Sequence, residues 1–325
     1  MLNDMNLEGA ELIAPPRASE LPRVLALGSP GAHSPAAGAN ALTPFFREQG
    51  SGPGVVCLHS SASSSSQWRG LMERLAPDFH VLAADSYGHG KSPPWPTDHK
   101  VSLHDEVSLL EPVFARAGQP FTLVGHSYGA AVALIAAIVR PWRVRALAVY
   151  EPTLFSVIEG EKPAPNEADA IREIVRAGNA DLAVGNRDAA AERFIDYWGG
   201  AGAWASMPEA RREAIGATIV NAEGWFNALM HEPTPLRTFM ALRVPVLYMV
   251  GTKSPASSLG VARLLAETLP QVRLVELAGV GHMGPLTHPD IVNEVIADFV
   301  QECKHLDEHD PPGLRPAPGR MARRG

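Results

Sequence analysis

Short apolar runs alternate with helix-forming stretches along most of this chain, and this alternation restricts the possible folds more than any other feature. Most of the apolar runs are short enough for strands, and longer stretches with helical periodicity lie between them. Strands are predicted at residues 55–58, 80–84, 121–125, 144–150, 244–250 and 272–277. Helices are predicted at residues 65–75, 103–117, 128–140, 259–268 and 290–303. This pattern is typical of the α/β class, in which a mainly parallel sheet is covered by helices on both faces.

The alternation stops after the fourth of these strands, and only helical patterns follow until the fifth. An inserted helical subdomain at 153–243 accounts for the gap, and it divides the α/β core into residues 41–152 and 244–303. Residues 1–40 are rich in Pro, Ala, Gly and Ser without sustained periodicity, which predicts a flexible N-terminal extension. The same features predict a disordered tail at 304–325.

The composition favours a packed globular protein, because 46% of the 325 residues are hydrophobic and 19% are charged. The net charge is −7 and the basic residues form no stripe, so we expect no nucleic-acid partner. No apolar run approaches the roughly 18 residues that a membrane helix needs, and the acidic N-terminus lacks the pattern of a signal peptide. Two cysteines, Cys57 and Cys303, are too few for a disulfide framework. They are compatible with a reducing cytosol, and we expect a cytoplasmic protein.

The stretch Gly125-His126-Ser127-Tyr128-Gly129 joins a predicted strand directly to a predicted helix. A sharp G-x-S-x-G turn in this position exposes the serine hydroxyl at the edge of the sheet, and it needs small neighbours because backbone segments pass close by. The start of the helix favours negative charge. The pentapeptide alone could be a plain glycine-rich turn, but its place between strand and helix predicts that Ser127 is a nucleophile.

The tetrahedral oxyanion formed by attack on a carbonyl needs two backbone N–H donors about 3 Å away. One is predicted to come from Tyr128, directly after the nucleophile. The other is predicted to come from Ser61, in the loop HSSAS that follows the strand VVCL. This serine-rich loop could instead be a flexible linker.

A general base must come from late in the chain and reach the serine. The segment LAGVGHMGPLTHP offers His282, next to Gly281 and two residues before Gly284. Histidine can take a proton from serine and return it to the leaving group. His288 is the local rival, but it precedes Pro289 at a helix start, where a capping or surface role is favoured. His282 is therefore predicted as the base, with a structural histidine as the alternative.

The motifs HSSAS, DSYGHGKS, GHSYGA and GVGHMGPL occur in this order and resemble those of the α/β-hydrolase superfamily over roughly residues 45–300. The resemblance implies the α/β-hydrolase fold, with the helical insertion in place of the family's cap domain. It also implies that Asp85 to Ser92 form a structural turn near the rim of the site. In this family the triad acid commonly follows the seventh strand, and that position is Ser254 here. A serine cannot stabilise an imidazolium as a carboxylate does.

A carboxylate is available on the neighbouring strand, whose end reads VRALAVYEPTLF. Glu151 stands at the C-terminal edge of the sheet, which also carries Ser127, and reactive groups gather at that edge. The family's fold places this strand beside that of the nucleophile, so the longer glutamate side chain could reach His282. Certain haloalkane dehalogenases supply a precedent for an acid after the sixth strand, although a serine nucleophile does not imply dehalogenation. The alternatives are that Glu151 is an ordinary strand-end charge, or that serine and histidine act without an acid.

Aromatic residues are frequent in the predicted insertion and favour an apolar substrate pocket, although each could instead pack the core of the insertion. The residues predicted to line this pocket are Trp198, Trp204, Trp225 and Phe226. No cluster of arginines indicates a clamp for phosphate or carboxylate. No metal-ligand spacing and no G-x-G-x-x-G turn are present, so no metal and no cofactor are predicted.

The sequence therefore predicts a cofactor-independent serine hydrolase that acts on small carboxylic esters or lactones with an apolar portion. Cleavage of amides, thioesters or carbon–carbon bonds stays open, because a fold does not determine a function. A protein of another class also stays open, namely a catalytically silent member of the superfamily that binds a ligand or a partner. The sequence specifies neither the natural substrate nor the oligomeric state.

Overall fold

The computed structural model describes residues 42–306. The flexible extension predicted at 1–40, the absence of a signal peptide, and all but the first three residues of the predicted tail lie outside the described residues. Those three residues do not begin a tail in the structure, because a 3-10 helix (η5, Cys303–His305) continues the last α-helix. Arg145 donates hydrogen bonds to the carbonyl groups of Lys304 and Leu306.

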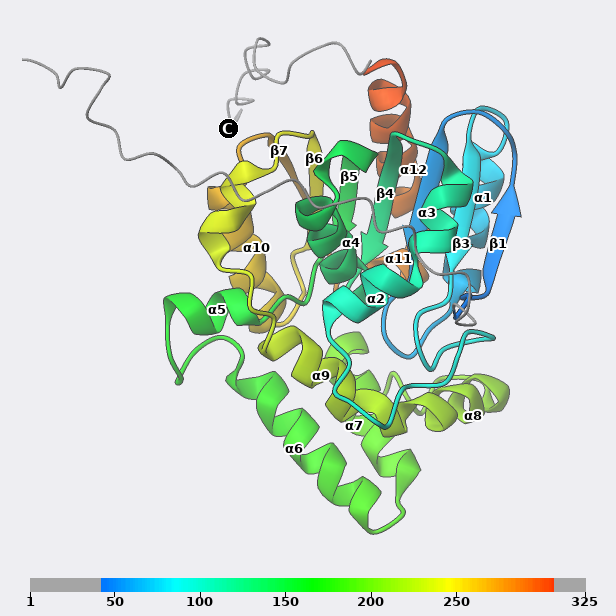
Figure 1. Ribbon diagram of the computed structural model, residues 1–325. Coiled ribbons are helices and arrows are strands. Elements are labelled where there is room, and N and C mark those ends of the chain that lie inside the picture. Colours follow the sequence, from blue (N-terminus) through cyan, green and yellow to red (C-terminus); the bar gives the residue numbers. More distant parts are fainter. Residues whose placement is uncertain (1–41, 307–325) are drawn as a thin grey trace, which may run out of the picture. The chain divides into compact units, whose positions relative to one another are not determined.

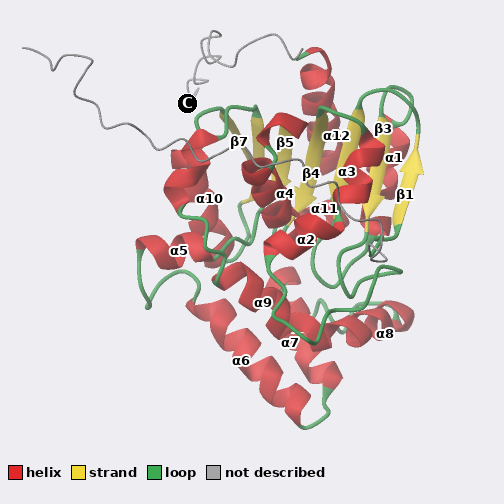
Figure 2. Ribbon diagram, in the orientation of Figure 1, coloured by secondary structure: helices red, strands yellow, loops and turns green. Residues whose placement is uncertain are grey.

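A seven-stranded sheet forms the centre of the described part (Figures 1 and 2). Its strands are β1 (Phe46–Gln49), β2 (Gly54–Leu58), β3 (His80–Ala84), β4 (Phe121–His126), β5 (Val144–Tyr150), β6 (Val246–Gly251) and β7 (Val272–Leu277). Their order across the sheet is β1-β3-β2-β4-β5-β6-β7. All neighbouring strands are parallel except β1, which runs antiparallel to β3. The nucleophile strand β4 therefore lies directly beside β5.

The α/β-hydrolase fold with a mainly parallel sheet is confirmed, and each of the six expected strands is present within two residues of its expected bounds. Every residue of β2, β4 and β6 is buried, because helices cover both faces of the sheet. Such strands are continuously apolar and therefore visible in the sequence. The edge strand β1 was not expected, since its sequence FREQ is short, polar and partly exposed.

Helices cover both faces of the sheet (Figure 2). One face carries α2 (Leu103–Leu109), α3 (Glu111–Ala117), α4 (Tyr128–Val139) and α10 (Ala256–Thr268). The opposite face carries α1 (Arg69–Leu75), preceded by η1 (Ser65–Trp68), and α12 (Pro289–Glu302), preceded by the short α11 (Gly284–Thr287). The helix predicted at 103–117 is divided in two at Leu110, because Pro112 lacks the N–H that a continuous helix would use.

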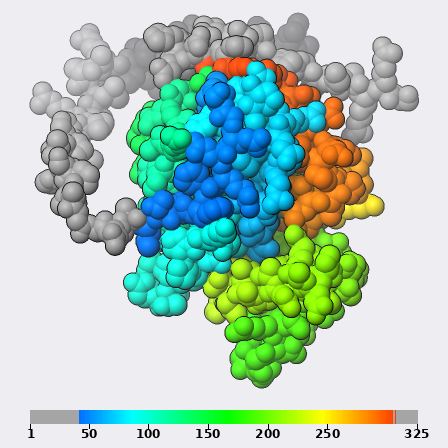
Figure 3. Space-filling view, turned by 90° about the vertical axis from the view of Figure 1, so that its right-hand side faces the viewer, coloured from blue at the N-terminus to red at the C-terminus, as the bar shows by residue number. Residues whose placement is uncertain are grey.

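Only helices lie between β5 and β6. They are α5 (Ser156–Glu161), α6 (Asp169–Ala183), α7 (Arg187–Gly199), α8 (Glu209–Thr218) and α9 (Ala222–Met230), with η3 (Ile219–Asn221) and η4 (Leu236–Ala241). We call residues 153–243 the helical insertion. It lies at the end of the sheet toward which β4 points (Figure 1). Figure 3 shows its green to yellow-green surface against the rest of the described chain. The insertion therefore stands over the edge that carries the candidate site.

Candidate active site

Ser127 occupies the turn between β4 and α4 in a backbone conformation that few residues other than glycine adopt, with φ +55° and ψ −116°. The turn is tightly packed. A Cβ on Gly129 would lie 2.5 Å from the carbonyl oxygen of His59, and one on Gly125 would lie 2.6 Å from Cα of Ala130. Only glycine fits at both positions. Strained backbone of this kind persists where the surrounding structure enforces it, and it holds the serine hydroxyl at the start of α4.

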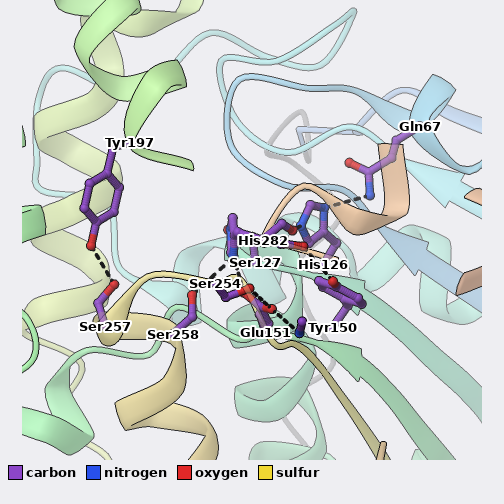
Figure 4. A network of polar contacts seen from close by, with 12 residues as sticks. Gln67, His126, Ser127, Tyr150, Glu151, Tyr197, Ser254, Ser257, Ser258 and His282 are labelled. Atoms are coloured by element: carbon purple, nitrogen blue, oxygen red, sulfur yellow. Dashed lines mark hydrogen bonds and ion pairs between the residues drawn. The ribbon is translucent and has the colours of Figure 1, made fainter. Parts of the chain in front are cut away.

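His282 lies in the loop between β7 and α11, and its ring is close to the hydroxyl of Ser127. Its Nε2 is 3.0 Å from Oγ of Ser127, and its Nδ1 is 2.7 Å from Oε2 of Glu151. All three side chains are almost completely removed from solvent. The structure thus brings the three residues together in one hydrogen-bonded row (Figure 4).

Glu151 follows β5 directly and also has a left-handed backbone, with φ +43°. Its Oε1 accepts hydrogen bonds from the N–H of Gly251, at 2.7 Å, and from Oγ of Ser254. Burial acts to raise the pKa of Glu151. The hydrogen bond and charge of His282, together with the Ser254 and Gly251 donors, outweigh burial and hold the pKa below its usual value. Glu151 is therefore a carboxylate at neutral pH.

Ser254, at the family's common acid position, supports the carboxylate instead of replacing it. Its hydroxyl donates to Glu151, as described above, and it is buried. Oγ of Ser258, from α10, lies 3.3 Å from Nδ1 of His282.

The pairing of β4 with β5 also fixes the position of the acid relative to the nucleophile. His126 is the register partner of Tyr150, and the N–H of Ser127 donates to the carbonyl of Tyr150 at 2.9 Å.

The two predicted oxyanion donors are the backbone N–H groups of Ser61 and Tyr128. Tyr128 is the first residue of α4, and the first N–H groups of a helix have no partner within it. Ser61 lines the same recess as Ser127 and His282. Within the described chain, neither the Ser61 nor the Tyr128 backbone N–H donates to another residue.

A histidine that sequence reasoning missed supports the Ser61 loop. His89 accepts a hydrogen bond at Nε2 from the N–H of Ala62, at 3.1 Å, and its Nδ1 donates to the carbonyl of Tyr87, at 2.8 Å. Burial lowers the pKa of His89 to about 3, so the ring is neutral and keeps an acceptor for Ala62. Ala62 has φ +55°. The hydrogen bond from the N–H of Ala62 to His89 stabilises this unusual conformation of the loop.

A second network connects this loop to the base (Figure 4). Ser60 donates to Oε1 of Gln67, and Nε2 of Gln67 lies 3.1 Å from Nδ1 of His126. Nε2 of His126 in turn lies 2.9 Å from the carbonyl oxygen of His282. Burial lowers the pKa of His126, so it serves as a neutral connector with its proton on Nε2. Neither Gln67 nor this role of His126 has a signal in the sequence, because each contact joins distant segments.

Asp85 is not part of the row. Its carboxylate accepts the backbone N–H groups of Ser65, at 2.6 Å, and Lys91, at 3.0 Å. It is buried, and a Cβ on Gly90 would collide with it. The segment from Asp85 to Ser92 is thus a tightly bonded turn.

A recess leads from Ser127 and His282 toward the insertion. Of the four aromatic residues predicted for the pocket, Trp198 lines it, together with Phe194. The Trp198 ring covers the imidazole of His282, with 4.0 Å between ring centroids. The neighbouring Tyr197 bonds Oγ of Ser257 at 2.8 Å and so ties α7 to α10 (Figure 4).

The other three aromatic residues line neither this recess nor the larger cavity beside it. Trp225 is buried and stacks on His89, with 4.9 Å between centroids. Trp204 is buried beneath Arg212, and Phe226 lies near Phe155. These three pack the insertion and its contact with the core. The pocket prediction therefore does not fit their positions.

Glu106, on α2, is completely buried behind the nucleophile turn. It accepts hydrogen bonds from the hydroxyl of Tyr128, at 3.2 Å, and the N–H of Tyr87, at 3.3 Å. Burial raises its pKa to about 7, although both donors oppose this. The folded protein therefore binds this proton more tightly than the unfolded chain does, where the pKa is about 4.3. The resulting stabilisation is fully present below that value and is lost as the pH rises through about 7.

Two further properties concern the part of the chain that the structure describes. It contains no group of three or more His, Cys, Asp or Glu side chains placed to hold a metal ion. None of its helices combines the length and the apolar character needed to cross a membrane.

The arrangement can carry nucleophilic chemistry. A hydroxyl lies within hydrogen-bond distance of one imidazole nitrogen, a carboxylate binds the other nitrogen, and the backbone N–H groups of Ser61 and Tyr128 have no partner among the described residues. A hydroxyl, imidazole and carboxylate placed at the C-terminal edge of this sheet define the class of α/β hydrolases by fold and site geometry. The model of the alpha/beta hydrolase family matches residues 55–295, and the chain belongs to this family.

Individual relatives are similar over most of the chain. The pimeloyl-(acyl-carrier protein) methyl ester esterase of Xanthomonas campestris pv. campestris (strain B100) is 31% identical over 264 residues, which cover 77% of this chain and 96% of the relative. The 2-(acetamidomethylene)succinate hydrolase of Mesorhizobium japonicum is 27% identical over 275 residues, 80% of this chain and 92% of the relative. A solved α/β hydrolase from Sphaerobacter thermophilus DSM 20745 superposes with a TM-score of 0.59 at 29% identity, covering 79% of this chain and 95% of that one.

Proposed function

We propose that this chain is a serine hydrolase that cleaves carboxylic esters or lactones through an acyl-enzyme on Ser127. One observation carries the proposal. The hydrogen-bonded row from Glu151 through His282 to Ser127 is unbroken, with distances of 2.7 and 3.0 Å. It supplies a nucleophile, a base and an acid without a further chemical group, so the reaction needs no cofactor.

The steps follow from the geometry. Oγ of Ser127 attacks the carbonyl carbon while Nε2 of His282 takes its proton. Glu151 accepts the hydrogen bond of Nδ1–H and stabilises the imidazolium. The N–H groups of Ser61 and Tyr128 bind the oxyanion. The carbon–oxygen bond of the ester then breaks, and His282 returns the proton to the leaving alkoxide. Water activated by His282 hydrolyses the acyl-enzyme in a second round of the same steps.

Esters and lactones are proposed because an alkoxide leaves more readily than an amine, and because the recess is mainly apolar. The names of two relatives agree with hydrolysis, but only one names an ester. One is a methyl ester esterase, and the other is a 2-(acetamidomethylene)succinate hydrolase, whose named substrate carries an amide group and no ester. Their activities are not transferred in detail, because the pocket residues decide the substrate.

The test is labelling with a fluorophosphonate, followed by hydrolysis of p-nitrophenyl esters of graded chain length. We expect a covalent adduct on Ser127 and ester hydrolysis that Ser127→Ala removes. A wild-type protein that folds but neither labels at Ser127 nor cleaves any ester would refute the proposal and indicate a silent binding module.

A further inference from the structure

A cavity of about 590 Å³ lies beside the recess of Ser127 and His282. The two spaces adjoin, because they share the lining residues Ile195, Met207, Arg211 and Met283. A substrate that has its carbonyl at Ser127 and reaches into the cavity would pass these four side chains. The cavity is large enough for a small acyl or alcohol group beyond the reacting carbonyl.

Most of the cavity wall is apolar or small. Leu286 and Thr287 continue it on the side of α11, and glycines and alanines of residues 199–203 form its far side. Arg211 is the single charged side chain among the residues that line the cavity and the recess. No lining residue of either space is acidic, so nothing in the wall neutralises the guanidinium.

Arg211 is directed to this space by its helix. It lies in the first turn of α8, four residues before Ile215, which also lines the recess. Residues four apart share one face of a helix, so α8 presents both residues to the recess, with Ile215 buried and Arg211 exposed to solvent. The adjacent Arg212 differs, because its guanidinium lies over the ring of Trp204, 6.0 Å from the centroid. Among the described ion pairs, none includes Arg211.

We propose that Arg211 binds a carboxylate of the substrate, so that the natural substrate is a monoanionic ester or lactone with an apolar spacer between the anion and the reacting carbonyl. This inference rests on the proposed function and names its substrate class. A planar guanidinium matches a carboxylate with two parallel hydrogen bonds. A phosphate dianion is disfavoured, because one arginine would leave a net negative charge against the apolar wall.

The test compares monomethyl and dimethyl esters of straight-chain dicarboxylic acids of graded length. The quantity measured is the ratio of kcat/KM for the monomethyl ester to that for the dimethyl ester. We expect the wild type to favour the monoanion about tenfold at the best chain length, since an exposed charged hydrogen bond contributes modestly. Arg211→Gln should bring the ratio close to one. The matched control Arg212→Gln should keep the wild-type ratio.

A second measurement does not require turnover. The monomethyl ester of adipic or pimelic acid should slow fluorophosphonate labelling of Ser127 in the wild type and less so in Arg211→Gln. Raising the salt concentration should weaken this protection. The inference is overturned if the wild type does not discriminate between the two esters, or if Arg211→Gln leaves both the ratio and the protection unchanged. Failure of the proposed function looks different, because neither ester would then be hydrolysed in a manner dependent on Ser127.

Discussion

Replacing Glu151 by glutamine tests the acid most directly, because the surroundings dictate how the amide must orient. Glu151 Oε1 receives the N–H of Gly251, which can only donate. The amide oxygen must therefore occupy this position, and the amide NH₂ must face Nδ1 of His282. Two donors cannot face each other, so the imidazole proton moves to Nε2. That nitrogen then points a hydrogen at Oγ of Ser127 and can no longer accept its proton.

The expected cost follows from this change of tautomer. The variant loses both the correct protonation of His282 and the charge that stabilises the imidazolium. In enzymes of this type such a change lowers kcat by about 10⁴-fold while the geometry persists. The shape of the side chain is unchanged, so KM should change little. The free energy of unfolding should fall only modestly, since two of the carboxylate's contacts are kept by the amide oxygen.

The assay is hydrolysis of p-nitrophenyl esters, with the thermal unfolding midpoint measured on the same preparations. Ser254→Ala is the matched control, because it removes one hydrogen bond to Glu151 but keeps the carboxylate. We expect it to lower kcat less than tenfold. The reasoning is wrong if Glu151→Gln retains more than a tenth of the wild-type kcat while Ser127→Ala is inactive.

Three more outcomes are expected. Glu106→Gln mimics the protonated carboxyl. The free energy of unfolding of the variant minus that of the wild type, measured with urea, should therefore be larger at pH 8 than at pH 5, by a few kcal/mol at most. Equal differences at the two pH values would contradict the raised pKa of Glu106. His89→Phe leaves the N–H of Ala62 without its acceptor and should lower kcat roughly a hundredfold by displacing the oxyanion loop; unchanged kcat in steady-state assays would exclude this role. Gly129→Ala would place Cβ 2.5 Å from the carbonyl oxygen of His59, so soluble, folded protein should be lost in expression trials and circular dichroism, and normal folding would show that the turn can relax.

The strands and the nucleophile turn were predictable because their signals are local. A strand buried on both faces is a short apolar run, and a strand-to-helix turn needs small residues at fixed positions. The contact of Glu151 with His282 joins residues 131 positions apart. It could nevertheless be anticipated, because strand order in this fold puts the end of β5 beside the nucleophile. β1 could not, since its four residues carry no apolar pattern.

The residues around the pocket were harder to predict because the local sequence does not show which way their side chains face. An aromatic side chain in a helix is consistent with a substrate wall and with a packed core, and only the orientation of the helix decides between them. Trp198 faces the recess, whereas Trp225 packs on His89. Arg211 gives no sequence signal, because one arginine next to another resembles an ordinary solvated surface. Its role is inferred from the lack of acids among the residues that line the recess and the cavity.

The places of Ser127 and Glu151 at the ends of two strands limit how far these two residues can move relative to each other. Both are the first residues beyond two adjacent parallel strands, and the N–H of Ser127 bonds the carbonyl immediately before Glu151. Their separation is thus fixed by one β-ladder and inherits its stiffness. His282 lies on a loop outside this ladder, and its position depends instead on the bond from His126 to its carbonyl and on the Trp198 ring over its imidazole. Amide hydrogen exchange should therefore be faster around residues 279–283 than at the ends of β4 and β5, because the N–H groups of this loop belong to no β-ladder.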